Sequence, residues 1–131
     1  MHQILQITRK YIKMRKGDCM ILDVSTLNGI IIITLTRRFD ADNAPAIEGE
    51  LKKLAEQRPQ RVLFDFSKTE YIASAGLRVL LTITRTILKT GGSVALSSLS
   101  PQVMRVFEIA GFTKIFSISG SREEALHNLQ K

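Results

Sequence analysis

The distribution of hydrophobic residues near the start of the chain predicts a β-hairpin. Two runs rich in β-branched residues, at 21–24 and 30–35, flank Leu27-Asn28-Gly29. Asn and Gly both tolerate positive φ, so an Asn-Gly pair between such runs favours a tight turn. The second run is hydrophobic at almost every position, which is typical of a strand buried on both faces. We therefore predict that residues 30–35 form a central strand.

The next segment has the pattern of an amphipathic helix followed by a strand. Ile47, Leu51 and Leu54 are spaced i, i+4 and i+7. The polar residues before them offer caps for a helix that ends near residue 56: Asp40, Asp42 and Asn43. The apolar run at 61–66 predicts a third strand. A helix between two strongly apolar strands implies parallel pairing through a right-handed crossover.

The remaining chain repeats this alternation. Gly91-Gly92 ends a helix, Ser100-Pro101 begins another by the N-cap and N1 preferences, and Ser121-Arg-Glu-Glu124 is a capping box. We expect helices at 75–89, 100–111 and 123–129, and strands at 93–97 and 112–118. The order β β α β α β α β α predicts an α/β fold, with a mixed β-sheet and helices packed mainly on one face.

The helix at 75–89 has hydrophobic residues beyond its expected inward stripe. That stripe is predicted to contain Leu77, Leu80, Leu81, Thr84, Ile87 and Leu88. Val79 and Ile83 fall outside it, on a face that is otherwise polar. They are either a docking surface for a partner or isolated exposed aliphatic residues, which are ordinary on protein surfaces.

Length and composition limit the possible functions. A chain of 131 residues with 44% hydrophobic residues is long enough for one globular domain. Cys19 is the single cysteine, and His2 and His127 lie far from it in sequence, so we expect no disulfide within the chain, no metal site and no cofactor. A reducing, cytoplasmic setting fits best. The longest aliphatic run, 30–33, is far too short to cross a membrane.

The formal net charge of +7 is concentrated at the start of the chain. Residues 1–18 hold five cations against one acid, a net +4, so the rest of the chain has only +3. Without a basic stripe interleaved with aromatic residues, we predict no direct contact with nucleic acid. We interpret residues 1–19 as a basic N-terminal extension and residues 20–131 as the domain. The alternative for the extension is a basic amphipathic helix that touches a membrane or a partner.

A serine stands at the point where a strand and turn lead into the helix at 75–89. Ser74 precedes the apolar run, and a serine there is a good N-cap, because its hydroxyl accepts a bond from a free backbone N–H. Ala75 and Gly76 have almost no side chain, so a partner could approach the Ser74 hydroxyl closely. Ser74 is therefore either a helix cap or a modification site.

Chemistry elsewhere in the chain is limited. Asp65 ends the third strand, where a carboxylate either caps the following turn or contributes charge to a site at the carboxyl ends of the strands. Ser74 has no histidine near it in sequence, and no phosphate-binding G-x-x-x-x-G-K-[ST] loop is present. We therefore predict a protein that is not an enzyme.

The motifs taken together resemble a known family. Phe64-Asp65-Phe66-Ser67, Tyr71-Ile72-Ala73-Ser74-Ala75-Gly76-Leu77, Gly91-Gly92 and the block from Ser100-Pro101 to Gly111-Phe112 are similar to the STAS domain family, and in particular to bacterial anti-sigma factor antagonists. The resemblance covers about residues 20–131. It implies a single STAS-like domain that is not an enzyme.

The resemblance also implies a mechanism. In that family an anti-sigma factor with serine kinase activity phosphorylates the antagonist, and a phosphatase acts on the phosphorylated form. The unphosphorylated antagonist binds the kinase, which then releases its sigma factor. The phosphorylated serine of the family falls on Ser74, its loop acid on Asp40, and its strand-end polar position on Asp65. The complete partner-binding surface expected here is Asp40, Asp65, Ala73, Ser74, Ala75, Gly76, Arg78, Val79 and Ile83.

Two positions depart from the family pattern. Many members have Asp where this chain has Ala73, and a Gly where it has Arg37-Arg38-Phe39. These differences leave open a different kinase, or a domain that binds partners without being phosphorylated. The alternative function is a STAS subunit of a membrane transport or stress-sensing assembly. The basic N-terminal segment and the Val79/Ile83 face would be its clues.

Overall fold

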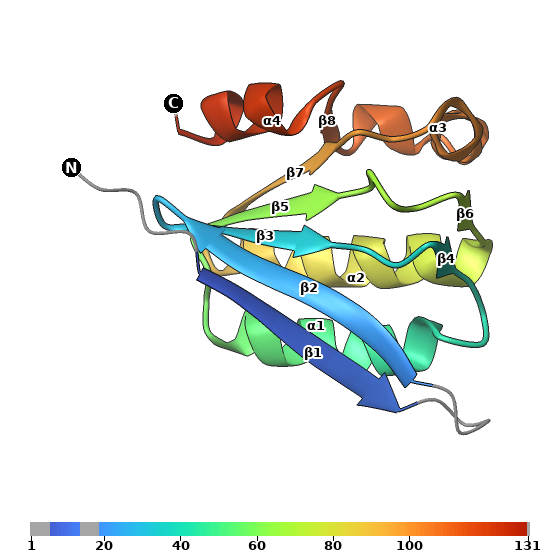
Figure 1. The fold of residues 1–131 in the computed structure, drawn as a ribbon. Helices are drawn as coiled ribbons and strands as arrows, with labels where there is room; N and C mark the ends of the chain where they lie inside the picture. The colour runs from blue at the N-terminus through green and yellow to red at the C-terminus, as the bar shows by residue number, and fades with distance from the viewer. Residues whose placement is uncertain (1–5, 14–18, 131) are drawn as a thin grey trace.

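The computed structural model of the chain describes residues 6–13 and 19–130. Within these ranges, a mixed sheet has the strand order β1-β2-β3-β5-β7-β8, and a separate pair of short strands, β4 and β6, lies beyond its carboxyl-end edge (Figure 1). The strands of the main sheet are β1 (Gln6–Lys13), β2 (Cys19–Leu27), β3 (Ile30–Thr34), β5 (Arg61–Asp65), β7 (Ser93–Ser97) and β8 (Ser117–Ser119).

The predicted hairpin is confirmed. β2 and β3 pair antiparallel, and the two turn residues Asn28 and Gly29 have φ of 52° and 79°. Ile30 and Ile32 are fully buried on one face of β3, and on the other face Ile33 is 2% exposed and Ile31 is partly buried. β3 is the doubly buried strand that its continuous run of isoleucines predicts.

The helices supply the parallel crossovers and divide the core. β3, β5, β7 and β8 pair in parallel, with α1 (Ala44–Glu56), α2 (Ser74–Lys89) and α3 (Pro101–Ile109) in the connections. Buried residues of these three helices join one apolar cluster, whereas α4 (Arg122–Leu129) packs with Ile30, Ile32 and Leu63 on the opposite face. The predicted α/β fold, with helices mainly on one face, is confirmed.

The N-terminal segment differs from one expectation. Residues 6–13 form β1, which pairs antiparallel with β2 from Gln6 opposite Thr26 to Lys13 opposite Cys19. The basic amphipathic helix considered for this segment is therefore wrong where the structure describes it. Residues 1–5 and 14–18 lie outside the described residues. The domain boundary at residue 20 stays a prediction.

The expected exposed face of α2 is also wrong. Val79 is 5% exposed and Ile83 is 2% exposed, so both belong to the core. The physical reason is that α2 packs against α1 on one side and the sheet on another, so its buried stripe is wider than that of a helix with one neighbour. Leu88, predicted to face inward, is instead 53% exposed.

The segment predicted as the last strand is only partly extended. Gly111 adopts the left-handed conformation, with φ of 76°, and a 3-10 helix, η1 (Phe112–Lys114), precedes the short β8. The rings of Phe112 and Phe116 both pack on Phe107, at centroid distances of 6.3 and 5.9 Å. Aromatic packing onto α3 therefore competes with strand formation in this segment.

Among the described residues, no helix combines the length and hydrophobicity that a membrane span requires.

Candidate functional site

The turn that carries Ser74 is fixed by the smaller sheet. β4 (Arg38–Phe39) and β6 (Tyr71–Ile72) pair in parallel, with Phe39 opposite Ile72. The Ala73 amide then donates to the Phe39 carbonyl oxygen at 2.9 Å. Asp40 and Ser74 each follow one of these bonded residues, so the loop after β4 and the start of α2 leave this small sheet together.

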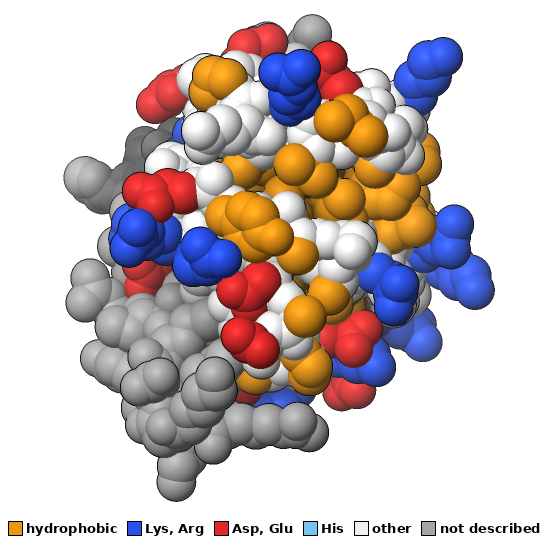
Figure 2. Space-filling model, turned by 90° about the vertical axis from the view of Figure 1, so that its right-hand side faces the viewer, with side chains coloured by type: hydrophobic (Ala, Val, Ile, Leu, Met, Phe, Trp, Pro, Cys, Tyr) orange, Lys and Arg blue, Asp and Glu red, His pale blue; other side chains and the backbone are white. Residues whose placement is uncertain are grey.

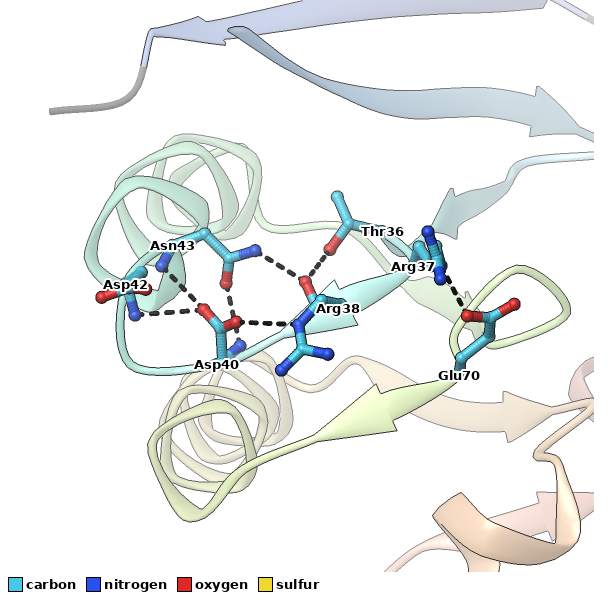
Figure 3. Close-up of polar contacts among 7 residues, drawn as sticks. All are labelled: Thr36, Arg37, Arg38, Asp40, Asp42, Asn43 and Glu70. Atoms are coloured by element: carbon cyan, nitrogen blue, oxygen red, sulfur yellow. Dashed lines mark hydrogen bonds and ion pairs between the residues drawn. The ribbon is translucent and has the colours of Figure 1, made fainter. Parts of the chain in front are cut away.

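Asp40 organises the loop that it begins. One carboxylate oxygen, Oδ1, accepts hydrogen bonds from the amides of Asp42 at 3.1 Å and Asn43 at 3.2 Å (Figure 3). In return, Asn43 Oδ1 accepts from the Asp40 amide at 3.0 Å, and Asn43 Nδ2 donates to the Arg38 carbonyl oxygen at 2.6 Å. These reciprocal bonds fix the loop that leads into α1. The predicted helix cap is wrong, because the bonded amides precede the first helical residue, Ala44, and the N-cap Asn43 forms no side-chain cap bond; Asp40 stabilises a turn instead.

Two arginines absent from the predicted site lie beside this loop. Arg37 Nε donates to Glu70 Oε2 at 2.5 Å. This hydrogen bond, and then the carboxylate charge, raise the pKa of the Arg37 guanidinium above its usual value. Arg38 stacks over the Tyr71 ring at 4.6 Å, and its Nε lies 3.4 Å from Asp40 Oδ2 (Figure 3). Adjacent arginines before Asp40 were the available signal, but Glu70 and Tyr71, which they contact, come from a distant segment.

Ser74 does not cap α2. The N-cap is Ala73, with φ −98° and ψ 170°, and Ser74 is the first helical residue. The Ser74 side chain is exposed, and its hydroxyl has no hydrogen-bond partner among the described residues. The helix-cap interpretation is therefore wrong. An alanine cap also provides no oxygen for the first free amides of the helix.

Position 76 needs a glycine because the first turn of α2 packs closely against Phe39. A Cβ built on Gly76 would lie 2.8 Å from the Phe39 carbonyl oxygen and 2.9 Å from Phe39 Cγ. Both Gly76 and Phe39 are buried. The interpretation that Gly76 leaves room for a partner is therefore wrong, because the space is filled by β4. Its neighbour Ala75 is half-buried and Arg78, one turn on, is exposed.

Asp65 is structural rather than available to a partner. Its side chain is only 2% exposed; Oδ1 accepts from the Ser67 amide at 2.9 Å, and Oδ2 pairs with Arg122 of α4 at 2.5 Å. The expected turn-capping role is confirmed. Arg122 was missed because it follows Asp65 by 57 residues and is brought to it by the packing of α4.

The structure therefore divides the predicted site in two. Asp40, Ala73, Ser74, Ala75 and Arg78 lie on or next to the turn built by β4 and β6 and are at least partly accessible. Asp65, Gly76, Val79 and Ile83 are buried.

Among the residues that the structure describes, no group of three or more His, Cys, Asp or Glu could hold a metal ion.

Comparison with protein families identifies one match. The sequence pattern described as the STAS domain matches residues 20–125. Two curated relatives are named as anti-sigma factor antagonists. BtrV of Bordetella bronchiseptica is 37% identical over 81% of this chain and 91% of its own length. The anti-sigma-B factor antagonist of Bacillus subtilis is 30% identical over 78% of this chain and 93% of its own.

Solved structures with the same fold have lower sequence identity. A crystal structure of an anti-sigma factor antagonist from Mycobacterium paratuberculosis matches with a TM-score of 0.77 and 21% identity, covering 96% of both chains. Phosphorylated SpoIIAA from Bacillus matches with a TM-score of 0.64 and 18% identity, over 82% of this chain and 97% of that one. A sulfate transporter family protein from Wolinella succinogenes matches with a TM-score of 0.68 and 16% identity, over 79% and 86%.

The contact between Gly76 and Phe39 predicts opposite effects of one substitution at two helical glycines. Gly76→Ala should lower the free energy of unfolding by about 1–3 kcal/mol, because the added methyl group forces β4 and α2 apart. Gly49→Ala is the matched control in α1, where nothing lies within 4 Å, and it should stabilise by about 0.5–1 kcal/mol. Urea denaturation measures both, and equal effects at the two positions would contradict the close approach.

The buried ion pair predicts a second stability difference. Arg122→Ala leaves the Asp65 carboxylate buried with only the Ser67 amide as a partner, so the free energy of unfolding should fall by about 1–3 kcal/mol. Arg105→Ala is the control, because Arg105 is exposed on α3 and forms no ion pair with a described residue. Indistinguishable thermal melts of the two variants would contradict a stabilising role of the Asp65–Arg122 ion pair.

Proposed function

Because this chain belongs to the STAS domain family, we propose that it is an anti-sigma factor antagonist, as two of its curated relatives are named. In this proposal it acts by binding and not by catalysis. Its partner is an anti-sigma factor with serine kinase activity, which releases a sigma factor when this chain binds. The proposed setting is the cytoplasm, without direct contact with nucleic acid or a membrane.

The observation that carries the proposal is the state of Ser74. Its hydroxyl is exposed and has no partner among the described residues, although the backbone around it is held by the β4–β6 pairing and by the Ala73 to Phe39 hydrogen bond. A kinase would therefore meet an available hydroxyl in a defined position. Ser74 is the proposed phosphorylation site.

A phosphate at this position should leave the fold intact. Phosphoserine adds about −1.5 to −2 charges, and the start of a helix attracts anions through its free amides and its dipole. Ala73 provides no side chain to occupy those amides, and Arg78 follows one turn later. The match of this fold to a phosphorylated structure, SpoIIAA, supports the same expectation. The switch should therefore act on binding rather than on folding.

The proposed interface surrounds Ser74 with small or polar residues. Ala73 and Ala75 are half-buried and provide little bulk, and Asp40 leaves the small sheet beside them. A contact built closely on the unmodified turn has no room for a phosphate, and burying its charges unpaired would cost several kcal/mol. A phosphatase would restore the binding form.

The alternative was a subunit of a transport or stress-sensing assembly. The fold alone does not separate the two functions, since a sulfate transporter family protein shares it. The two features that would have favoured the alternative no longer do so. Residues 6–13 form a sheet strand and not an amphipathic helix, and Val79 and Ile83 are buried in the core.

Two substitutions at Ser74 should show that its charge affects partner affinity and not the stability of the fold. Ser74→Asp should melt close to the wild-type temperature, because Ser74 is exposed and an acid is favourable in the first turn of a helix. It should bind the anti-sigma factor about 100-fold more weakly, since a desolvated charge costs several kcal/mol. Ser74→Ala should match the wild-type chain in both respects. Calorimetric titration and thermal melts provide the measurements.

Ser93→Asp is the control for adding an acid at another exposed serine. Ser93 begins β7, whereas the turn that carries Ser74 lies beyond the carboxyl ends of the parallel strands. The Ser93→Asp variant should leave affinity for the anti-sigma factor unchanged. Wild-type affinity of the Ser74→Asp variant would contradict the proposal.

A further inference from the structure

The outer edge of β1 is the longer of the two edges of the main sheet. β1 lies at the end of the strand order, and among the described residues it pairs with β2 alone (Figure 1). It has eight residues, whereas β8, the strand at the other edge, has three. β1 also precedes residues 20–125, which match the STAS pattern, so the proposed function gives it no role. Hydrophobic side chains gather elsewhere, on the face shown in Figure 2.

The β2–β3 hairpin shows which backbone groups of these two strands face each other. Leu27 and Ile30 flank the two-residue turn Asn28-Gly29, and residues that flank such a turn exchange hydrogen bonds with each other. The parallel side of β3 gives the same answer. The Leu35 amide donates to the Asp65 carbonyl oxygen after β5, so Ile30, an odd number of residues earlier, points to β2.

The same alternation identifies the outward backbone groups of β1. Because Leu27 points to β3, its neighbour Thr26 points to β1, where Gln6 lies opposite it. Gln6 and every second residue after it therefore bond to β2. The residues between them have amide and carbonyl groups that point away from β2, at intervals of about 7 Å. These residues are Ile7, Arg9, Tyr11 and Lys13.

The sequence of β1 carries positive charge and no acid. Its basic residues are Arg9, Lys10 and Lys13. Pairing of β1 with the β1 of a second copy would bring three cations from each chain onto adjacent strands, and like charges across a strand pair are destabilising. Charge therefore favours an acidic strand over a second copy of this chain.

We propose that the outer edge of β1 binds an extended, acidic segment of a partner protein by strand addition. The outward amide and carbonyl groups bond to the added strand, and the basic residues select acidic side chains in it. A phosphate-bearing surface offers acceptors but no donors for the outward carbonyl groups, so a peptide strand fits this edge better. This contact is separate from the turn that carries Ser74, which is built by β4 and β6 and not by the main sheet.

Amide hydrogen exchange, followed by NMR, tests the backbone geometry. In the unbound chain the amides of Thr8, Lys10 and Ile12 should be protected, and those of Arg9 and Tyr11 should exchange rapidly. The probe is an eight-residue peptide of alternating Glu and Val, which matches the length of β1. At saturation it should slow exchange at Arg9 and Tyr11 about tenfold or more.

Two further peptides are matched controls for this probe. A peptide of alternating Lys and Val keeps the strand pattern and reverses the charge. The Glu and Val peptide methylated at every backbone nitrogen keeps the charge and lacks the donors. Neither should protect the outward amides of β1, because the first is repelled and the second cannot complete the strand pairing.

Charge reversal on β1 tests the selection of acidic strands. The variant Lys10→Glu/Lys13→Glu should bind the Glu and Val peptide about tenfold more weakly in low salt, and it should bind the Lys and Val peptide instead. Lys89→Glu/Lys114→Glu is the matched control, because it makes the same change in net charge at exposed positions of α2 and η1. It should bind like the wild-type chain. Fluorescence anisotropy of labelled peptides measures these affinities.

Several results would overturn the proposed strand addition. Failure of the Glu and Val peptide to bind the wild-type chain would leave the basic residues of β1 as a guard against aggregation at the edge. Equal binding of either control peptide would exclude an acidic strand. Protection of Arg9 and Tyr11 that grows with the concentration of the chain alone would assign the edge to a second copy. None of these measurements uses the anti-sigma factor, so such results would leave the proposed function standing.

Discussion

The close approach of α2 to Phe39 determines where Ser74 lies. The Phe39 carbonyl oxygen accepts the Ala73 amide at 2.9 Å, and Gly76 brings the first turn of the helix against the same residue. Phe39 is itself fully buried, so the contact is anchored in the core. A larger residue at position 76 could not make this approach. The exposed hydroxyl is thus held by buried neighbours on a short two-stranded sheet.

A rigid support of this kind suits a switch that changes charge. The Asp40 and Asn43 bonds fix one side of the turn, and the Asp65 bond to Ser67 fixes the segment that leads into it. The hydroxyl between them is free among the described residues. Adding a phosphate would therefore alter the surface while leaving the support in place, and a partner would distinguish the two forms by charge and space.

Sequence reasoning identified the fold because its main elements are locally encoded. The Asn28-Gly29 turn, the isoleucine-rich β3 and the serine caps of α3 and α4 each depend on neighbouring residues. It missed β4 and β6, since two residues carry no periodic pattern, and it misplaced the cap of α2 because the Ala73 conformation is imposed by Phe39. It placed Val79 and Ile83 outside because periodicity cannot show that a helix has two packed neighbours. The Asp65–Arg122 pair likewise depends on tertiary packing.

Phosphorylation in vitro tests most directly whether Ser74 is the switch residue. The protein and a Ser74→Ala variant are incubated with the anti-sigma factor kinase and ATP, and the mass of each intact chain is measured, followed by fragmentation to locate the modification. If Ser74 is the phosphorylated residue, the wild-type chain gains the mass of one phosphate, carried by Ser74, and the variant gains none. A phosphate on another residue, equal modification of the variant, or an unmodified wild-type chain would contradict it.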